Sequence, residues 1–216
     1  MKPCRKWAGI SFFGFLILMA FSSCRKDPLK NLSNDESRIY ISNYDTTAHF
    51  EAYQTFSIED SVNIIRDNQS LGKQLGPFET NVIGAIRQAM KGRGYTEVDK
   101  SAKPDLAMNV SRVTNTSTGI FSYPDYWGSY GSFYDPYYWG YAGYGYYAPY
   151  MIGVYTIQTG GLEIDMLDLQ HAAANGNKIG VVWTGLARGE AVFDSANAAT
   201  EVNALFDQSP YLKANN

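Results

Sequence analysis

The sequence predicts an α+β fold, a two-layer sandwich in which an antiparallel sheet packs against two amphipathic helices. Several segments alternate apolar and polar residues, which is typical of half-buried strands. Two other segments repeat apolar residues at intervals of three and four, which is typical of helices packed on a core. A third feature stands outside both patterns, because residues 114–155 form a long Tyr- and Gly-rich insert between two predicted strands.

The first half of the domain contains two strands and a helix. Ile39 and Ile41 alternate with polar neighbours, which predicts a strand, and Thr55–Ile58 is a short second strand. The period then changes over residues 80–93, where apolar residues recur three and four apart. Thr80 can cap the start of this helix and two glycines can end it, so we expect an amphipathic helix over about residues 80–93.

The second half of the domain returns to a period of two. The apolar residues expected on one face of each strand are Leu106, Met108 and Val110, and then Leu162, Ile164 and Met166. The turn signal Asn175-Gly176 separates the latter strand from another apolar strand, which predicts a hairpin. A last amphipathic pattern stops at Pro210 and predicts a helix of about twelve residues.

The first forty residues indicate export and lipidation. Three basic residues precede an apolar run and then Ser22, Ser23 and Cys24, which is the pattern of a signal peptide over residues 1–23. The Cys after small residues resembles a bacterial lipobox, in which Cys24 carries a diacylglycerol thioether and an acylated amino terminus. Two or three acyl chains hold a protein stably on a membrane. We therefore expect a lipid anchor at Cys24 and a polar tether over residues 24–37.

The residue after the expected lipidated Cys bears on the location of the protein. Arg25 stands where an Asp would resemble an inner-membrane retention signal, which favours the outer membrane. The periplasmic and the cell-surface face both stay open. The folded part is expected to be a single α+β domain over residues 38–213, which suits the length of the mature chain.

Charge and cysteine content narrow the classes of function. Without residues 1–23 the chain has 15 Lys and Arg against 21 Asp and Glu, and no Lys or Arg lies between Val113 and Asn177. Nucleic acid is excluded as a partner, because phosphate binding relies on clustered basic residues. Of the two cysteines, Cys4 leaves with the signal peptide and Cys24 is lipidated, so no disulfide and no catalytic thiolate are expected.

The sequence indicates no catalytic site, no metal site and no cofactor. His49 and His171 are the only histidines, and they lie far apart in the chain and are interpreted as strand-proximal or loop residues. Glu163 and Asp165 are two apart on a predicted strand and so share one face. They could form an acid/base pair of a hydrolase-like enzyme, but the expected interpretation is the solvated face of an amphipathic strand. We therefore expect a protein that is not an enzyme.

The order of the motifs resembles a known family. These motifs are YDTTAHFEAYQTF, KPDLAMNV, GGLEIDMLDLQ, NKIGVVWTGLARG and ALFDQSP, in that order along about residues 38–212. The chain is similar to the DUF4136 family of bacterial lipoproteins, whose members also carry aromatic, Gly-rich inserts before the LEID strand. The resemblance implies an envelope lipoprotein with an α+β domain, and it implies no activity.

The insert raises the main functional question. Residues 121–150 contain eleven Tyr, two Trp, two Phe, five Gly and three Pro. The glycines and prolines argue against a long regular helix, and an insert of this length is uncommon in a compact domain. Tyr126-Trp127 and Tyr138-Trp139 form a near-repeat twelve residues apart, so these four residues are candidate binding residues.

Three interpretations of the insert stay open. The rings can pack on one another and on the sheet, in which case the insert is purely structural. They can bind a neutral glycan or an envelope protein partner, since rigid aromatic residues with Gly and Ser neighbours give contact area at low entropic cost. They can also enter a membrane interface near the lipid anchor. The regular apolar periods lie outside the insert, so we expect the body to unfold cooperatively even when a short Gly/Ser linker replaces residues 119–153.

Overall fold

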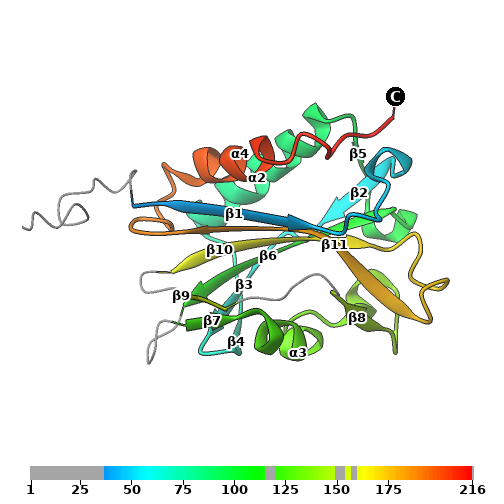
Figure 1. The fold of residues 1–216 in the computed structure, drawn as a ribbon, viewed down its shortest axis with the longest axis horizontal. Helices are drawn as coiled ribbons and strands as arrows, with labels where there is room; N and C mark the ends of the chain where they lie inside the picture. Colours follow the sequence, from blue (N-terminus) through cyan, green and yellow to red (C-terminus); the bar gives the residue numbers. More distant parts are fainter. Residues whose placement is uncertain (1–36, 115–119, 149–153, 157–159, 216) are drawn as a thin grey trace, which may run out of the picture. The chain divides into compact units, whose positions relative to one another are not determined.

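The structure is a computed structural model that describes residues 37–114, 120–148, 154–156 and 160–215. Cys24, the signal peptide and most of the tether lie outside these residues. The described part contains one nine-stranded mixed sheet and a separate two-stranded sheet, shown in Figure 1. The strands of the large sheet are β1 (Ile39–Tyr44), β2 (Thr55–Ile58), β3 (Val62–Arg66), β4 (Gln69–Gln74), β5 (Thr96–Glu97), β6 (Leu106–Thr114), β8 (Gly145–Tyr147), β10 (Gly161–Asp168) and β11 (Lys178–Arg188).

The central strands of the large sheet are antiparallel, as predicted. The sheet order is β1-β11-β10-β6-β2-β5, in which β11 pairs with β1 and β10, and β10 pairs with β6. Shorter strands make the sheet mixed, because β2 and β3 pair with β6 in parallel and β8 pairs with β11 in parallel. The predicted hairpin is confirmed as β10–β11, whereas the sequence pattern did not predict the hairpin β3–β4.

Two helices cover one face of this sheet, α2 (Pro77–Gly92) and α4 (Ala198–Asp207). Their apolar stripes meet the predicted strand face in one buried cluster, which includes Val82, Met108, Ile164 and Leu205. The predicted α+β sandwich is therefore confirmed. The helix α2 begins at Pro77 rather than Thr80, because the Glu79 carboxylate accepts a hydrogen bond from the Gly76 amide at 2.9 Å and proline is favourable at the first helical position.

The motif VVWTG places a tryptophan inside this cluster. Trp183 is fully buried, and its indole Nε1 donates to the Ser209 hydroxyl at 2.9 Å. A Cβ at Gly185 would lie 2.6 Å from Cη2 of Trp183, so the ring needs a residue without a side chain two positions away. The motif is thus a packing motif of the sheet.

The insert covers the opposite face of the sheet. A second buried cluster joins sheet residues such as Ala107, Leu167 and Ile179 to insert residues such as Tyr130 and Phe133. Figure 1 shows α3 (Tyr123–Phe133) on the side of the sheet away from α2 and α4. The two-stranded sheet of β7 (Ile120–Ser122) and β9 (Val154–Thr156) closes the base of the insert. The insert therefore adds a cover on the second face.

The helix α3 corrects the expectation that the insert contains no long regular helix. Tyr126, Tyr130 and Tyr134 recur every fourth residue, so they lie along one side of this helical segment and face the sheet. Their neighbours on the sheet are polar. The Asn109 amide donates to the Tyr130 hydroxyl at 2.8 Å, and the hydroxyls of Ser111 and Tyr134 are 3.1 Å apart. Burial of the rings and satisfaction of these polar groups outweigh the low helix propensity of two glycines.

No helix in the described part of the chain is long and apolar enough to cross a membrane.

Candidate functional site

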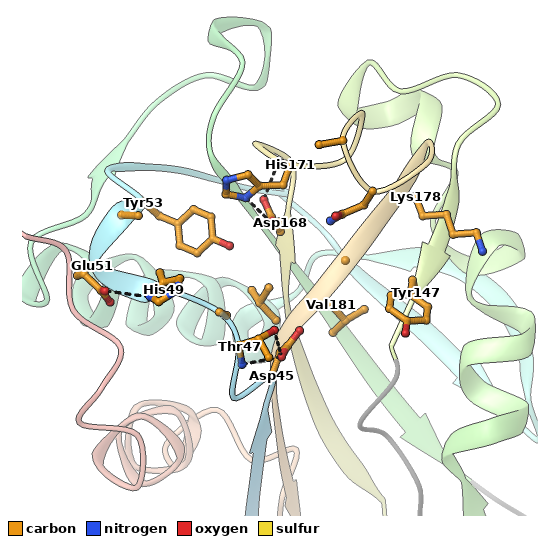
Figure 2. Close-up of a pocket in the computed structure, with 16 residues that line it drawn as sticks. Asp45, Thr47, His49, Glu51, Tyr53, Tyr147, Asp168, His171, Lys178 and Val181 are labelled. Atoms are coloured by element: carbon orange, nitrogen blue, oxygen red, sulfur yellow. Dashed lines mark hydrogen bonds and ion pairs between the residues drawn. The ribbon is translucent and has the colours of Figure 1, made fainter.

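A cavity of about 920 Å³ opens at one end of the large sheet, and we call it the end cavity. Because β1 and β10 both run antiparallel to β11, the carboxyl ends of β1 and β10 lie beside the amino end of β11. The segments that follow β1 and β10 and the first residues of β11 therefore converge there. Figure 2 shows side chains from these segments around one open space, with Tyr147 of β8 on the side of Lys178.

A histidine–carboxylate pair forms one wall of the end cavity. Asp168 ends β10, and its Oδ1 accepts from the backbone amide of His171 at 3.0 Å. Its Oδ2 lies 2.8 Å from Nδ1 of the same histidine. A carboxylate only accepts hydrogen bonds, so Nδ1 of His171 carries a proton and donates to Asp168. The Asp168 side chain is buried, whereas the His171 ring is half exposed.

Tyr53 lies beside this pair in the lining of the cavity. Its ring meets the His171 ring edge-on, with centroids 5.9 Å apart. Burial, and then the nearby Asp168 carboxylate, raise the pKa of the Tyr53 phenol well above its ordinary value. The phenol therefore keeps its proton and is a hydrogen-bond donor at neutral pH.

The KPDL motif holds the segment of Tyr53 against the sheet. Asp105 Oδ2 accepts from the backbone amides of Gln54 and Thr55 at 2.8 and 2.9 Å. The Asp105 carbonyl accepts from the amide of Leu169, which follows β10. One aspartate at the start of β6 thus fixes both segments that carry the wall of the end cavity.

The loop after β1 forms another part of the lining. Asp45 Oδ1 accepts from the amide and the hydroxyl of Thr47 at 2.8 and 2.7 Å, an Asx turn that fixes this loop. Nδ1 of His49 lies 3.3 Å from Glu51 Oε1, and the His49 side chain is 81% exposed. Both histidines of the chain therefore line the same cavity, each with Nδ1 against a carboxylate.

The insert contributes the remaining side of the cavity. Tyr147 is 53% exposed, and Lys178 Nζ lies 5.9 Å from the centre of its ring. The Tyr141 hydroxyl donates to the Leu169 carbonyl at 2.8 Å and so ties the insert to the loop after β10. The insert thus holds the loop after β10 in place and contributes one exposed ring, that of Tyr147, to the lining of the cavity.

The end cavity contains one pair with the geometry of a general base. The Asp168–His171 pair has the arrangement of a base held by a carboxylate. Yet the described residues that line the cavity include no Ser or Cys, and the Thr47 hydroxyl donates to Asp45. Among the described residues, no group of three or more His, Cys, Asp or Glu is placed to hold a metal ion.

The four candidate binding residues lie in the packing layer of the insert. Tyr126 and Trp139 are 0% and 5% exposed, so a ligand cannot reach these rings without displacing the insert. Trp127 is half-buried and stacks on Tyr130 with centroids 4.2 Å apart. Tyr138 is also half-buried, and Lys100 Nζ lies 3.6 Å from its ring centre, so the body supplies a cation to an insert that has none of its own.

The expectation of a solvated face at Glu163 and Asp165 is wrong. Both side chains are 0% exposed because the insert covers the strand face on which they lie. Tyr126 donates its hydroxyl to Asp165 Oδ2 at 2.6 Å. Burial raises the pKa of Asp165 to about 7, which the Tyr126 hydrogen bond partly opposes. Solvent does not reach this pair in the structure, so a hydrolase site there would need the insert to open.

His49 and His171 are the site residues that sequence reasoning missed. The spacing of Asp168 and His171, at the end of a strand and three residues later, is a local signal that would have found one pair. The second pair, His49 and Glu51, joins it only through the topology of β1, β10 and β11. No periodicity in the sequence carries that information.

Comparisons with known proteins agree with the fold. A family model described as a domain of unknown function, DUF4136, matches residues 41–211. A crystal structure of a DUF4136 family protein from Bacteroides thetaiotaomicron is 28% identical, with a TM-score of 0.68 over 83% of this chain and 99% of that chain. A PelC dodecamer from Paraburkholderia phytofirmans is a distant match, 8% identical, with a TM-score of 0.39 over 83% of this chain and 99% of that chain. No curated protein sequence matches the chain.

Proposed function

We infer a function from the geometry of the chain itself, because it belongs to the DUF4136 family, a family of unknown function. We propose that it is a lipid-anchored protein of the bacterial outer membrane that binds a small polar ligand in the end cavity. In this proposal the protein is a binding module without catalytic activity, and the insert is a structural cover that completes the site.

One observation carries the binding role. The end cavity has the volume typical of small-molecule sites, which is about 300–1,000 Å³, and polar side chains converge on it from three segments. Hydrogen bonds hold these side chains in place before any ligand arrives, as the Asp168–His171 and Asp45–Thr47 contacts do. Preorganised polar groups lower the entropic cost of binding.

The insert is a weaker candidate for the binding surface. The hydroxyls of its tyrosines are hydrogen-bonded to buried polar groups of the sheet, such as Asp165 and Asn109. A neutral glycan or a protein partner on Tyr126 and Trp139 would have to displace these rings from the core. We therefore place the binding site at the end cavity, to which the insert lends Tyr147.

The anchor part of the proposal rests on the sequence. Cys24 follows a signal peptide and precedes a polar tether, so acyl chains on this residue would hold the domain at the membrane. The tether spans at most about 45 Å when extended, which keeps the end cavity within reach of envelope components on either face of the outer membrane.

A cavity-filling variant tests the binding role. The test screens envelope monosaccharides, amino sugars, muropeptide fragments, inorganic phosphate and Zn²⁺ for an increase in melting temperature. A ligand at a hundred times its Kd should raise the melting temperature by about 5–10 °C. Gly180 lines the cavity, and a Cβ added to this glycine would meet no atom closer than 3.9 Å, so Gly180→Phe should fill the site without a clash at its base.

The matched control is Gly128→Ala, at an exposed glycine of α3 where an added Cβ would point into open space. We expect a ligand that stabilises the wild type and the Gly128→Ala variant but not Gly180→Phe. If no compound of the panel shifts the melting temperature, or if Gly180→Phe responds like the wild type, the end cavity is not the binding site.

A further inference from the structure

The sheet face beneath the insert carries a band of polar side chains. Asp165 on β10 lies opposite Asn109 on β6, and Glu163 lies opposite Ser111 on the same two strands. All four residues are 0% exposed. Buried polar groups oppose folding unless they have hydrogen-bond partners, so the hydrogen bonds of this band decide how stably the insert can cover it.

The hydrogen bonds of the band leave two acceptors facing one another. The Tyr126 hydroxyl donates to Asp165 Oδ2 at 2.6 Å, and the Asn109 amide donates to the Tyr130 hydroxyl at 2.8 Å. Oδ1 of Asp165 and Oδ1 of Asn109 have no hydrogen-bond partner in the described part of the chain. Directly opposite residues have Cβ atoms about 4.5–5.5 Å apart, so these two side chains are neighbours on one face.

A proton on Asp165 resolves this arrangement. A carboxylate only accepts hydrogen bonds, whereas a protonated carboxyl group has one O–H donor. With the proton on Oδ1, Asp165 can donate toward Oδ1 of Asn109 while Oδ2 still accepts from Tyr126. The closed arrangement of the insert therefore fits the neutral acid better than the carboxylate.

The surroundings of Asp165 offer little to an ionised carboxylate. Burial raises the pKa of Asp165 to about 7, and hydrogen bonds from Tyr126 and Tyr130 partly oppose this shift. On the charged side of the balance, Lys73 of β4 is paired with Glu59, and no cation of the described residues is among the groups that shift the Asp165 pKa. The other groups packed around this carboxyl are Tyr134, Tyr146 on β8, Thr184 on β11 and Glu163 on its own strand.

The helix α3, which supplies Tyr126 and Tyr130, has little stability of its own. It has eleven residues, and its interior contains Gly128 and Gly131, each of which is less favourable in a helix than alanine. A Cβ at either glycine would meet no atom within 4 Å, so packing does not require them. Short isolated helices are marginal in water, so α3 depends on its contacts with the sheet.

We propose that α3 is a lid over the polar band, closed on β6 and β10 while Asp165 is protonated and opened more often once Asp165 is ionised. Opening gives water access to Asp165 and Glu163. Trp139 and the rest of the insert after α3 stay in the second buried cluster. This inference concerns the other face of the sheet and does not rest on a ligand in the end cavity.

The direction of the pH effect follows from which state holds the proton more tightly. The closed state has the raised pKa and the open state has the ordinary value of 3.8, so opening releases a proton between about pH 4 and about pH 7. The ratio of closed to open molecules is therefore highest at low pH. It should fall by about fiftyfold from about pH 5 to about pH 7, and only by about twofold from about pH 7 to about pH 8.

Hydrogen exchange of the full chain, followed by mass spectrometry of peptides, measures this ratio for α3. The protection of each peptide is corrected for the intrinsic exchange rate at about pH 5, 6, 7 and 8. We expect the α3 peptides to follow the course given above. The most protected amides of α2 should be at least about tenfold more protected than those of α3 at each pH, because they exchange only when the whole protein unfolds.

Three variants separate the proton of Asp165 from the packing of α3. Asp165→Asn keeps an acceptor for Tyr126 and cannot ionise, so its α3 protection should change by less than about threefold between about pH 5 and about pH 8. Gly131→Ala favours the helix without touching Asp165, so it should raise α3 protection by about two- to fivefold at every pH with the wild-type dependence on pH. Asp207→Asn, at an exposed carboxylate of α4, should behave as the wild type.

Two results would overturn the lid. If the corrected α3 protection of the wild type does not change with pH, or if Asp165→Asn shows the same decline, the proton of Asp165 does not control α3. If α3 and α2 are equally protected at every pH, α3 opens only when the whole protein unfolds. Neither result bears on ligand binding in the end cavity, which the melting-temperature screen tests separately.

Discussion

Replacement of Asp165 by asparagine should change how the stability of the protein depends on pH. Asp165 lies on β10 under the insert and is 0% exposed, with Tyr126 as a hydrogen-bond donor at 2.6 Å. The groups that face it come from the insert and the sheet: Tyr126 and Tyr130 of α3, Tyr134, Tyr146 on β8, Asn109 on β6, Thr184 on β11 and Glu163 on its own strand. Burial, partly opposed by the Tyr126 hydrogen bond, raises its pKa to about 7 from an ordinary value of 3.8.

The direction in which the unfolding free energy changes with pH follows from the linkage between protonation and folding. The folded state holds the proton of Asp165 more tightly than the unfolded state does. The stability contributed by this proton is complete below about pH 4 and is lost as the pH rises through about 7. At about 1.4 kcal/mol per pKa unit, the wild type should lose about 3 kcal/mol of unfolding free energy from this residue between about pH 5 and about pH 8.

Asparagine should remove this loss because it is neutral at every pH. Its carbonyl can still accept from Tyr126, and its amide can donate to Asn109 Oδ1, which has no hydrogen-bond partner in the described part of the chain. Urea unfolding followed by tryptophan fluorescence should show Asp165→Asn more stable than the wild type by about 2–4 kcal/mol at about pH 8. The difference should be smaller at about pH 5.

The control is Asp207→Asn, since this carboxylate is 80% exposed. Its stability should follow that of the wild type within about 0.5 kcal/mol at both pH values. If Asp165→Asn shows the same pH dependence as the wild type, or is less stable at about pH 8, then Asp165 is ionised and well solvated in the folded protein.

Three further predictions concern the anchor, the KPDL motif and the insert. In cells, Cys24→Ala should abolish incorporation of labelled palmitate, and a wild-type protein that takes up no label would refute the lipid anchor. Asp105→Ala leaves two backbone amides without their carboxylate and should lower the unfolding free energy by about 2–3 kcal/mol in urea titrations, whereas a change below about 0.5 kcal/mol would contradict its bracing role. Contrary to the expectation from the sequence, replacement of residues 119–153 by a Gly/Ser linker should abolish cooperative thermal unfolding, because Tyr126, Tyr130 and Trp139 belong to the second buried cluster, and a retained sharp transition would show that the insert is dispensable.

The strands and helices with strict periods could be predicted from the sequence. Leu106, Met108 and Val110 alternate because one strand face meets the helices, and the same holds for Leu162, Ile164 and Met166. The opposite face could not be predicted, because its partners are tyrosines. A tyrosine buries its ring and satisfies a polar neighbour with its hydroxyl, so a strand face that contains Asp165 can be buried although its pattern is that of a solvated face.

The insert and the end cavity show two further limits of sequence reasoning. Gly128 and Gly131 argue against a helix by local propensity, yet tertiary contacts of Tyr126 and Tyr130 outweigh that preference. The four-residue spacing of these tyrosines was a visible signal for α3. The end cavity left no such signal, because His49 and His171 line one cavity only when β1 and β10 pair with β11.

The central claim is that the aromatic insert is part of the folded core. Trp139 is 5% exposed within the second buried cluster, and Tyr137, two residues earlier in the same short helix, is 71% exposed. The most direct measurement is the unfolding free energy of Trp139→Ala beside that of Tyr137→Ala, by urea titration at neutral pH. We predict a loss of about 3–5 kcal/mol for Trp139→Ala and a change within about 0.5 kcal/mol for Tyr137→Ala. If both variants instead change the unfolding free energy by the same small amount, the claim is contradicted and the insert is an exposed loop rather than part of the core.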